Sequence, residues 1–429
     1  MRILNIGGAT AIIEHAGKRI LFDPWMDEGI FHGAWYHYPP SAVKIKDLGH
    51  LDYVYISHIH EDHCSAGTIK HLNEDAEIIL LDKKPNFVAK FLDNYRFKFK
   101  KIHLIKPKTP TMILPNLCVD MLTGDPANPM AYALDSTLIL KWDDFVLVNA
   151  NDCIPYKDGL DYILSTYQHI DFALLPYGGG SGYPSCYLNL TDEEKIQEKE
   201  RILKGRLESF VNNVNYLKPK YVMPFADQYL VAGNRSHLNK YISHAVSPGV
   251  VEDYIKGKEF KSNLLLLNSG QTFDFNEGEK IPNVSYKKHT DEDRESYIRS
   301  LKEIKYDYEH FALNPAVPLD RLVNFARARL WKMQQQNDYC PDFKLYLDAN
   351  DSERRFCINM LNDTAEEISF SKACEKPYLR IAVPDTLLMM LLVGHVSWNI
   401  ADAALFLDYE RVPNIYDGKI YEYLNYLRV

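Results

Sequence analysis

The chain has 429 residues, a length that predicts two or three structural units or one large α/β domain with an appendage. With 46% hydrophobic and 25% charged residues it has the composition of a globular protein, which excludes the disordered, collagen-like and coiled-coil classes. The 58 acidic and 49 basic residues give a net charge of -9, so no general nucleic-acid-binding surface is expected.

The cysteines and the apolar stretches indicate the cellular setting. The seven cysteines are scattered and form no CxxC or CxH motif, so a disulfide framework, a zinc ribbon and a Rieske cluster are not expected. An odd number of cysteines, with an N-terminus that lacks a long apolar run, predicts a cytoplasmic protein. The most apolar stretch, 387–407, contains Gly394, His395, Asn399 and Asp402, which favours a buried helix over a membrane span.

Short strands separated by turns dominate the first 150 residues. Glycine-containing breaks between the first three runs predict an antiparallel meander, and a hairpin is predicted across 142–144. The expected strands lie at 3–6, 11–15, 19–23, 53–57, 78–81, 137–141 and 145–149, and a helix is expected at 87–95.

A long helix is predicted in the middle of the chain. Thr191 and Glu194 form a capping box, and apolar residues recur at helical spacing as far as Leu217. Pro219 is expected to end this helix, and 221–225 is predicted to be the next strand.

The character of the sequence changes near residue 290, which predicts two domains, 1–285 and 290–429. The polar segment 284–292 is the expected boundary. In the second part, the strand at 379–383 and the helix after Pro384 carry many apolar residues, so we expect this α+β domain to pack on the first. The sequence does not decide whether it covers an active site or forms a homodimer contact.

The strongest functional signal is an HxHxDH motif, His58 to His63, directly after a predicted strand. Three imidazoles and a carboxylate within six residues favour a metal site over a set of internally bonded core groups. His58 and His60 point the same way from an extended backbone, so both can bind one ion. Asp62 and His63 lie past the bend and are free to bind a second ion. The motif predicts one or two divalent ions, each roughly 2.0–2.2 Å from its ligands.

This motif and its surroundings resemble the metallo-β-lactamase superfamily. The likeness includes the opening strand-Gly-strand unit and Asp23-Pro24, and it covers about residues 1–285. It implies a four-layer αββα sandwich with the metal site at its mouth. It also implies that Asp152, after the predicted hairpin, is the carboxylate that bridges two metals; the structural alternative is an Asx turn at a strand end.

Two ligands of the superfamily have no obvious counterpart. No histidine lies between His103 and Asp152, so the third histidine is missing. Asp135, or the less well placed Asp125, could substitute for it, and a surface role for either is the alternative. If Asp135 does substitute, Asp135→Asn should weaken metal retention far more than Asp125→Asn. The final histidine is also missing from its expected place, which Asp227 occupies, with His237 and His244 further on.

The metal is predicted less narrowly than its ligands. Zinc is the first expectation, and an oxygen-rich ligand set would suit iron or manganese better than a nitrogen-rich zinc site. A bound divalent ion would lower the pKa of its water from 15.7 towards roughly 7 and polarise a carbonyl or phosphoryl oxygen. Asp62 would orient or deprotonate that water as well as bind metal.

A narrower resemblance is to the metallo-β-lactamase-type domain of the CMP-N-acetylneuraminate hydroxylase family and its bacterial relatives. The animal-type hydroxylases also carry a Rieske domain, whose CxH and CxxH motifs this sequence lacks. The resemblance rests on Asp23-Pro24-Trp25, Gly33-Ala34-Trp35, the Asn-x-Asn-Asp-Cys segment at 149–153, Tyr183-Pro184-Ser185-Cys186-Tyr187 and Pro224-Phe225-Ala226-Asp227.

Aromatic and glycine-rich segments near the motif are candidates for binding substrate. Trp25 and Trp35 lie in an aromatic-rich stretch that would wall a pocket for a sugar or base, or pack as a loop over the sandwich. The segment 177–183, which ends in Tyr183, would close over substrate or serve as plain turn material.

A second candidate for substrate binding is the segment with Asn234, Arg235 and His237. The guanidinium fork of an arginine matches phosphate or carboxylate, so this segment is a weak candidate for anion recognition. A solvated loop is the favoured alternative.

The sequence supports three hypotheses of function. The first is a metal-dependent hydrolase of a small-molecule ester, lactone, amide or phosphodiester, with a nucleotide-linked sugar as the substrate that the narrower resemblance suggests. The second is an iron-dependent oxidoreductase served by a separate electron-transfer protein. The third is a degenerate, metal-free scaffold that binds a ligand.

Overall fold

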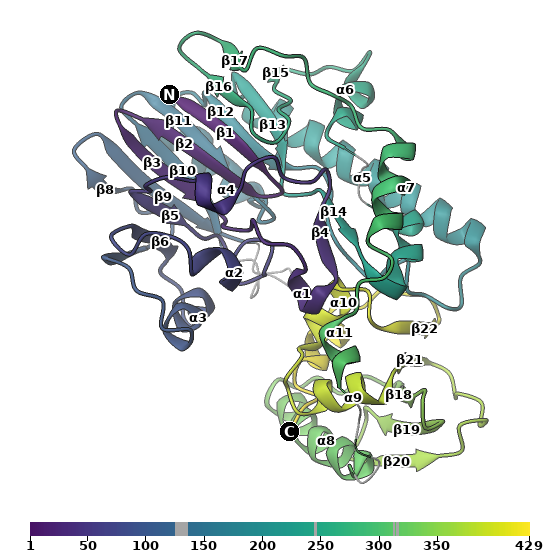
Figure 1. Ribbon diagram of the computed structural model, residues 1–429. Coiled ribbons are helices and arrows are strands. Elements are labelled where there is room, and N and C mark those ends of the chain that lie inside the picture. Colours follow the sequence, from purple (N-terminus) through teal and green to yellow (C-terminus); the bar gives the residue numbers. More distant parts are fainter. Residues whose placement is uncertain (125–135, 244–246, 312–313, 315–316) are drawn as a thin grey trace.

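Two β-sheets packed face to face form the larger part of the molecule, and a smaller α+β unit lies at one end of them (Figure 1). The structure is a computed structural model and describes residues 1–124, 136–243, 247–311, 314 and 317–429. No helix in these described ranges has both the length and the apolar character needed to cross a membrane.

The first sheet carries the N-terminal meander at its centre. The first three strands pair antiparallel, and the strands after β3 continue in parallel. This is the meander predicted from the glycine-containing breaks. In spatial order the strands are β17 (Glu279–Ile281), β16 (Thr272–Asp274), β1 (Arg2–Gly7), β2 (Thr10–His15), β3 (Lys18–Phe22), β5 (Tyr53–Tyr55), β6 (Glu77–Leu81) and β7 (Lys101–Ile105).

The second sheet contains the predicted hairpin. Leu138 pairs with Asn149 and Trp142 with Phe145, so the turn crosses 143–144 as expected. The order is β15 (Asn263–Leu264), β13 (Tyr221–Phe225), β12 (Phe172–Pro176), β11 (Phe145–Asn149), β10 (Ser136–Trp142), β9 (Leu117–Thr123) and β8 (Thr111–Leu114). A two-stranded ribbon, β4 (Trp35–His37) with β14 (Tyr229–Val231), stands beside the two sheets.

Helices cover both outer faces, so the predicted four-layer αββα sandwich is confirmed. Apolar residues from both sheets, such as Phe22 and Tyr55 from the first and Leu138 and Leu174 from the second, form one buried core. The helices α2 (Ala66–Ile69) and α3 (Phe87–Asn94) flank the first sheet, and α4 (Lys157–Thr166), α5 (Asp192–Leu217) and α6 (Gly249–Ile255) cover the second.

The predicted capping box starts α5. Thr191 Oγ1 accepts from the backbone N–H of Glu194, and the Glu194 carboxylate accepts from the backbone N–H of Thr191. The helix ends at Leu217 because Lys218 takes a left-handed conformation one residue before Pro219. The sequence therefore predicted both ends of this helix.

The C-terminal unit has its own sheet, ordered β20 (Ala365–Ile368), β19 (Arg354–Asn359), β18 (Lys344–Ala349), β21 (Tyr378–Val383) and β22 (Asp408–Val412). The apolar stretch 387–407 forms two short helices rather than one, because Gly394 (φ 74°) follows the first of them. The helices of this unit are α8 (Leu319–Gln336), α9 (Asp385–Leu392), α10 (Trp398–Ala403) and α11 (Gly418–Leu424).

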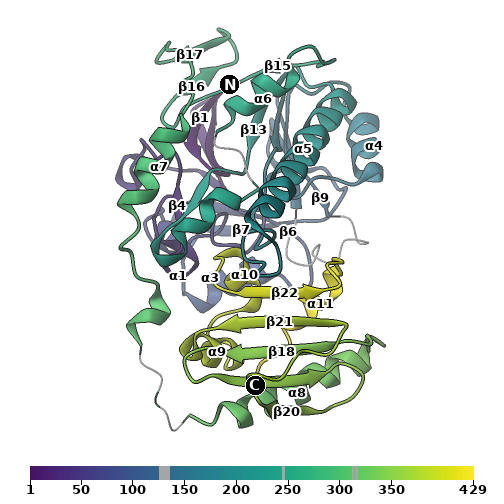
Figure 2. The same cartoon turned by 90° about the vertical axis from the view of Figure 1, so that its right-hand side faces the viewer.

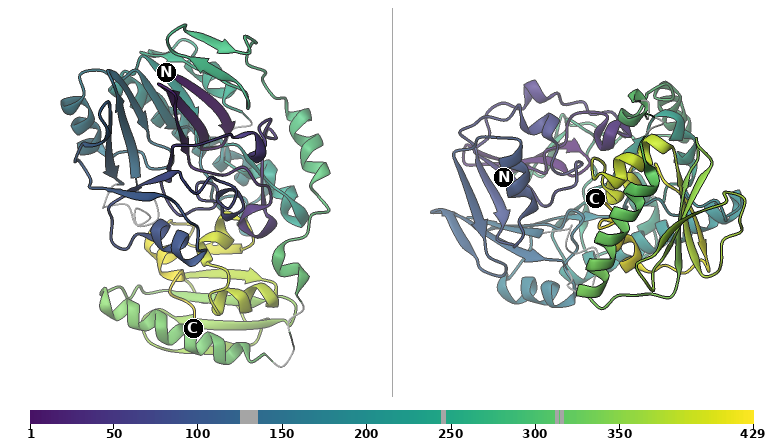
Figure 3. Two further views of the ribbon diagram at one scale, coloured as in Figure 1. Left: turned by 60° about the vertical axis from the view of Figure 1, so that its left-hand side comes forward. Right: turned by 90° about the horizontal axis from the view of Figure 1, so that it is seen from below.

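The segment before α8 packs along the sandwich (Figure 3). The helix α7 (Asp291–Ser300) and the turn η3 (Asp307–His310) belong by contact to the first part: Arg294 Nη2 donates to the Asn239 carbonyl, and Tyr306 Oη donates to the Ala232 carbonyl. The residues of α7 and η3 therefore pack on the sandwich.

The helix α10 lies at the seam between the two parts, near α1 (Ile30–Gly33) (Figures 1 and 2). Trp35 Nε1 donates to the Ala403 carbonyl, and the guanidinium of Arg235 donates to both oxygens of Asp408. One apolar cluster contains residues of both parts, including Trp35 and Leu405. This seam brings the C-terminal unit beside the histidine motif.

Candidate metal centre

The strand β5 delivers the histidine motif to the edge of the first sheet. After Ser57 the chain bends, and the backbone N–H groups of His63 and Cys64 both donate to the His60 carbonyl. The bend brings His58 and His63 to the same side, with their ring centroids 4.1 Å apart. The two rings therefore do not face opposite ways, an arrangement that would have contradicted a metal site.

Ligand atoms from both sheets converge at this edge. One nitrogen each of His58 and His63 and one carboxylate oxygen of Asp152 all lie within 4.8 Å of one another. His63 Nε2 is 3.4 Å from Asp62 Oδ2 and 3.4 Å from Asp152 Oδ2. Both histidines are buried, whereas the side chain of Asp152 keeps 30% of its surface exposed. The histidines of the centre are therefore shielded from solvent, whereas the Asp152 carboxylate is partly exposed to it.

The position of Asp152 is fixed by the loop after β11. Asn151 (φ 40°) accepts from the Asp152 and Cys153 backbone N–H groups through its own Oδ1, and its Nδ2 donates to the Ser136 carbonyl. These are the bonds of an Asx-type turn. This turn does not exclude a ligand role for Asp152, because it directs the Asp152 carboxylate towards the histidines.

Each imidazole of the motif has its second nitrogen bonded away from the centre. His63 Nδ1 is 2.9 Å from Asp23 Oδ2, and His60 Nε2 is 3.1 Å from Asn399 Oδ1, so a ring N–H at either nitrogen would donate to an oxygen acceptor. His58 Nδ1 is 2.9 Å from Ser57 Oγ, whose own proton goes to Asp23. The nitrogens that face the centre are His58 Nε2, His60 Nδ1 and His63 Nε2.

These three nitrogens fit a cation. His58 Nε2 and His60 Nδ1 lie only 3.1 Å apart with their lone pairs facing, an arrangement that needs a shared proton or metal ion between them. His63 Nε2 faces two carboxylate oxygens. Neutral imidazoles and ionised carboxylates are the donors that zinc, iron and manganese take in proteins.

The pKa values of the histidines follow from burial and from the carboxylates. Burial lowers the pKa of His58 well below its usual value and lowers that of His60. Burial would also lower the pKa of His63, but Asp62, Asp152 and Asp23 outweigh it and hold the pKa well above the usual value.

Asp23 positions Ser57 and His63 through hydrogen bonds, a role that was not predicted from the sequence. Its carboxylate is fully buried and accepts from the Ser57 backbone N–H at 2.7 Å, besides Ser57 Oγ and His63. Its φ of 42° is a strained value for a residue other than glycine. Burial raises the pKa of Asp23 in spite of these donors. The signal in the sequence was the Asp-Pro pair after β3.

The structure describes only some of the residues named in connection with the two missing histidines. Asp125, Asp135 and His244 lie outside the described residues, so the Asp135 prediction stays a prediction. Asp227 follows β13 where the final histidine was expected, and its carboxylate packs directly on Cα of Gly178. Asp227 is not among the residues whose ligand atoms converge with those of His58 and His63.

The aromatic residues predicted to wall a pocket lie in the interior. Trp25 stacks on His37 at a centroid distance of 3.6 Å, and Trp35 stacks on Tyr229; both indoles are buried. Their packing matches the alternative of a loop packed over the sandwich. Tyr183 is half-buried and its hydroxyl donates to Glu198.

The anion-recognition segment joins the two parts of the molecule. Arg235 is already paired with Asp408, so its charge is not available for a phosphate. Asn234 Nδ2 donates to Glu309, and His237 is exposed with Nδ1 against the Asn234 carbonyl. The structure therefore corrects the suggested role of Arg235, because its fork binds a carboxylate of the chain itself.

The glycine-rich loop at 178–182 packs closely against Asp402 and Tyr229. A Cβ atom at Gly182 would lie 2.5 Å from Asp402 Oδ1, and one at Gly180 would lie 2.8 Å from the Tyr229 hydroxyl. Only glycine permits this approach, so the loop is a packed segment beside the centre rather than plain turn material.

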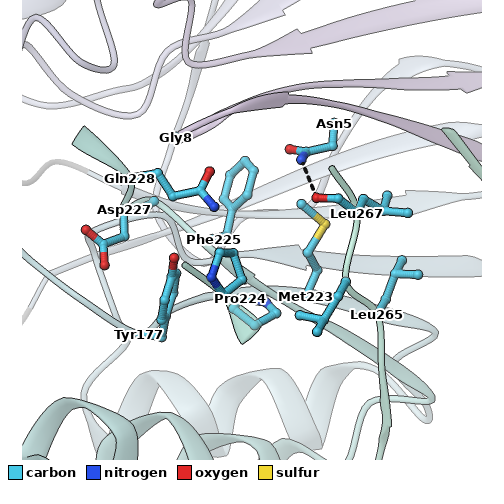
Figure 4. Close-up of a pocket in the computed structure, with 13 residues that line it drawn as sticks. Asn5, Gly8, Tyr177, Met223, Pro224, Phe225, Asp227, Gln228, Leu265 and Leu267 are labelled. Carbon is cyan, nitrogen blue, oxygen red and sulfur yellow. Dashed lines mark hydrogen bonds between the residues drawn. The ribbon is translucent and has the colours of Figure 1, made fainter. Parts of the chain in front are cut away.

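A small cavity lies beneath the loop after β13 and not at the metal centre. It has about 10 Å³ of space, which is room for one water molecule. Figure 4 shows Tyr177 and Asp227 at one end of it and Met223 and Leu267 at the other. It is too small to hold a substrate.

Comparisons with known proteins agree with the fold and the motif. Residues 2–150 match the family model of the beta-lactamase superfamily domain. A protein of Mycobacterium tuberculosis named "Putative Rieske 2Fe-2S iron-sulfur protein" is 30% identical over 197 residues, 44% of this chain and 36% of that protein. The cytidine monophosphate-N-acetylneuraminic acid hydroxylase of Cricetulus griseus is 30% identical over 254 residues, 56% of this chain and 42% of that one. The aligned regions cover less than half the length of these relatives.

Two solved structures also resemble this chain. An isothiocyanate hydrolase from Delia radicum gut bacteria is 17% identical with a TM-score of 0.45, over 64% of this chain and 99% of that one. CmlA, a diiron β-hydroxylase from Streptomyces venezuelae, is 14% identical with a TM-score of 0.41, over 62% of this chain and 53% of that one.

The sandwich, with its HxHxDH motif at the sheet edge, defines a protein of the metallo-β-lactamase fold. The residues that match the family model of the beta-lactamase superfamily domain, 2–150, include the motif. Its relatives include CMP-N-acetylneuraminic acid hydroxylase and Rieske-like mycobacterial proteins, which confirms the narrower resemblance seen in the sequence.

Proposed function

We propose that this protein is a metal-dependent hydrolase that holds one or two divalent ions with His58, His60, Asp62, His63 and Asp152. The observation that carries the proposal is that ligand atoms of His58, His63 and Asp152 lie within 4.8 Å of one another. Beside this group, His60 Nδ1 is 3.1 Å from His58 Nε2 and Asp62 Oδ2 is 3.4 Å from His63 Nε2. A divalent ion held there would activate a water and polarise a carbonyl or phosphoryl oxygen.

The chain's own residues divide the remaining tasks. Asp62 keeps 18% of its side chain exposed beside His63, which places it to accept a proton from a water at the open side of the centre. Asp152 binds from the opposite sheet. Asp23 and Ser57 orient the histidines through hydrogen bonds, so the centre is assembled before substrate arrives.

The substrate is a polar small molecule with an ester, lactone, amide or phosphodiester bond. A nucleotide-linked sugar is the substrate class suggested by the relative named cytidine monophosphate-N-acetylneuraminic acid hydroxylase. No nucleic-acid or membrane partner is proposed. The cytoplasm is the expected location, and a homodimer stays a prediction.

The test is metal analysis of protein purified without added metal, followed by hydrolysis assays with and without a chelator. Zinc or manganese near stoichiometric amounts, with hydrolysis that the chelator stops and the metal restores, supports the proposal. His58→Ala and His60→Ala should each abolish metal binding and keep most of the fold, since the sandwich core is apolar. Substoichiometric metal that no addition rescues would support the metal-free scaffold instead.

A second function is favoured by the relatives. One is named as a hydroxylase and others as Rieske proteins, so an iron-dependent oxidoreductase that works with a separate electron-transfer protein is the alternative. It requires stoichiometric, redox-active iron, and turnover that depends on an added reductant and oxygen. Hydrolysis without either would exclude this alternative.

A further inference from the structure

A side chain of the C-terminal unit contacts the histidine motif. Asn399 lies in the first turn of α10, after the Ser397 cap, and is separated from His60 by 339 positions in the chain. Its Oδ1 is 3.1 Å from His60 Nε2. His60 is the one histidine of the motif that takes its outward hydrogen bond from the second unit, since Ser57 and Asp23 serve the other two.

This contact bears on which nitrogen of His60 carries the proton. An imidazole that faces an amide oxygen with Nε2 must present N–H there, and in the neutral ring this leaves Nδ1 unprotonated. His60 Nδ1 is the atom that faces His58 Nε2 at 3.1 Å. Without the amide oxygen, either tautomer is available to His60, and one of them points an N–H at the ion.

The position of Asn399 is fixed by its own surroundings. Its backbone N–H donates to Asn425 Oδ1, and the neighbouring Trp398 Nε1 donates to the Leu427 carbonyl, which tie the start of α10 to the chain end. On the facing side, Glu61 of the motif accepts from the Phe31 backbone N–H at 2.6 Å, and α1 lies beside α10. The start of α10 is therefore tied to the chain end, and the histidine motif is tied to α1.

We propose that Asn399 is a positioning residue of the metal centre: it selects the His60 tautomer that offers Nδ1 to the ion, so the C-terminal unit completes the site. This inference rests on the proposed metal centre. Acceptors that hold the outward N–H of a ligating histidine change metal affinity by about 10- to 100-fold when removed.

The test compares Asn399→Leu, which keeps the volume and removes the acceptor, with Asn399→Asp, which keeps an acceptor oxygen. Asn324→Leu is the matched control, because Asn324 is exposed in the same unit and bonds only a carbonyl of its own helix. Cobalt(II) is the probe for affinity, and nitrogen-15 spectra of histidine-labelled, metal-free protein report the tautomer of each ring. Thermal unfolding is measured for every variant.

Three results are expected together. Asn399→Leu should lose about 10- to 100-fold in cobalt affinity and should lose the pure Nε2–H tautomer of His60, with the spectra of His58 and His63 unchanged. Asn399→Asp should keep both the tautomer and the affinity. Asn324→Leu should match the wild type in affinity and spectra.

The outcomes separate this inference from the function on which it rests. If the wild type binds cobalt and Asn399→Leu binds it equally well with the same His60 tautomer, the positioning role is overturned and the metal centre stands. If Asn399→Asp fails as badly as Asn399→Leu, the acceptor is not the cause and the proposal is also overturned. If the wild type binds no cobalt, zinc or manganese, the metal centre itself is overturned.

Discussion

At the scale of single residues, the centre depends on groups that bind no metal themselves. Asp23 is the clearest case, because one buried carboxylate holds Ser57 and His63 at the same time. Its strained backbone is kept by these bonds, as is common where a site is organised before its ligand arrives. The residues that contact the ligands are therefore as informative to mutate as the ligands themselves.

Replacing Asp23 with Asn should leave the fold intact and weaken metal binding. Asn tolerates the left-handed backbone, but its amide cannot accept from Ser57 Oγ, Ser57 N–H and His63 Nδ1 as a carboxylate does. We expect about 10- to 100-fold lower affinity by metal titration. Asp143→Asn, at an exposed carboxylate of the β10–β11 hairpin, is the control. Equal affinity in the two variants would contradict the assigned role.

The carboxyl group of Asp402 should make the stability of the folded protein depend on pH. Burial raises the pKa of its carboxyl, although the Tyr409 hydroxyl and the Gly182 backbone N–H oppose the shift. A raised folded pKa contributes stability that is present below the unfolded pKa of about 3.9 and is lost as pH rises through the folded value. Asp402→Asn removes this loss, so its stability relative to the wild type should rise with pH above about 4 and then level off. A pH-independent difference in urea unfolding would contradict this.

At the scale of elements, close backbone contact holds the glycine-rich loop against the two units. The loop at 178–182 lies against Asp227, Tyr229 and Asp402, each at a different glycine. This explains why a sequence too irregular for a phosphate-binding motif still carries so many glycines.

Two Gly→Ala substitutions should change stability in opposite directions. At Gly182 the new Cβ would clash with the Asp402 carboxylate, so Gly182→Ala should lower the unfolding temperature. Gly205 lies in the middle of α5 with no atom within 4 Å of an added Cβ, so Gly205→Ala should stabilise by about 0.5–1 kcal/mol. Thermal unfolding of both variants checks this, and a stable Gly182→Ala protein would show that the seam yields easily.

At the scale of the whole molecule, the two parts share apolar surface and hydrogen bonds. The cluster that contains Trp35 and Tyr229 of the sandwich side also contains Leu387, Leu405 and Tyr409 of the C-terminal unit. Arg235 and Asp408 add a half-buried ion pair across the same seam. Separation would expose a continuous apolar face.

A chain shortened to end near residue 285 should therefore be insoluble or aggregated, even with metal added. The physical reason is the exposed side of this shared cluster, together with the loss of α7 and η3 from the sandwich. Expression, size-exclusion chromatography and metal titration measure the outcome. A soluble, monomeric fragment that binds metal as the full chain does would show that the C-terminal unit is an independent module.

The sequence by itself determined the elements whose causes are local. The capping box of α5, the β10–β11 hairpin and the HxHxDH turn each follow from residues close together in the chain. Asp152 was predicted through the resemblance, and the structure brings it to His63 from the other sheet.

Only the tertiary structure decided which distant residues meet. Asn399 reaches His60 across 339 positions, and Arg235 meets Asp408 across 173, contacts for which no local pattern exists. The same holds for Trp35, whose aromatic ring is equally suited to a pocket wall and to a core until its neighbours are known. Local chemistry fixes what a side chain can do, whereas the packing of remote segments fixes what it faces, and the metal centre required both.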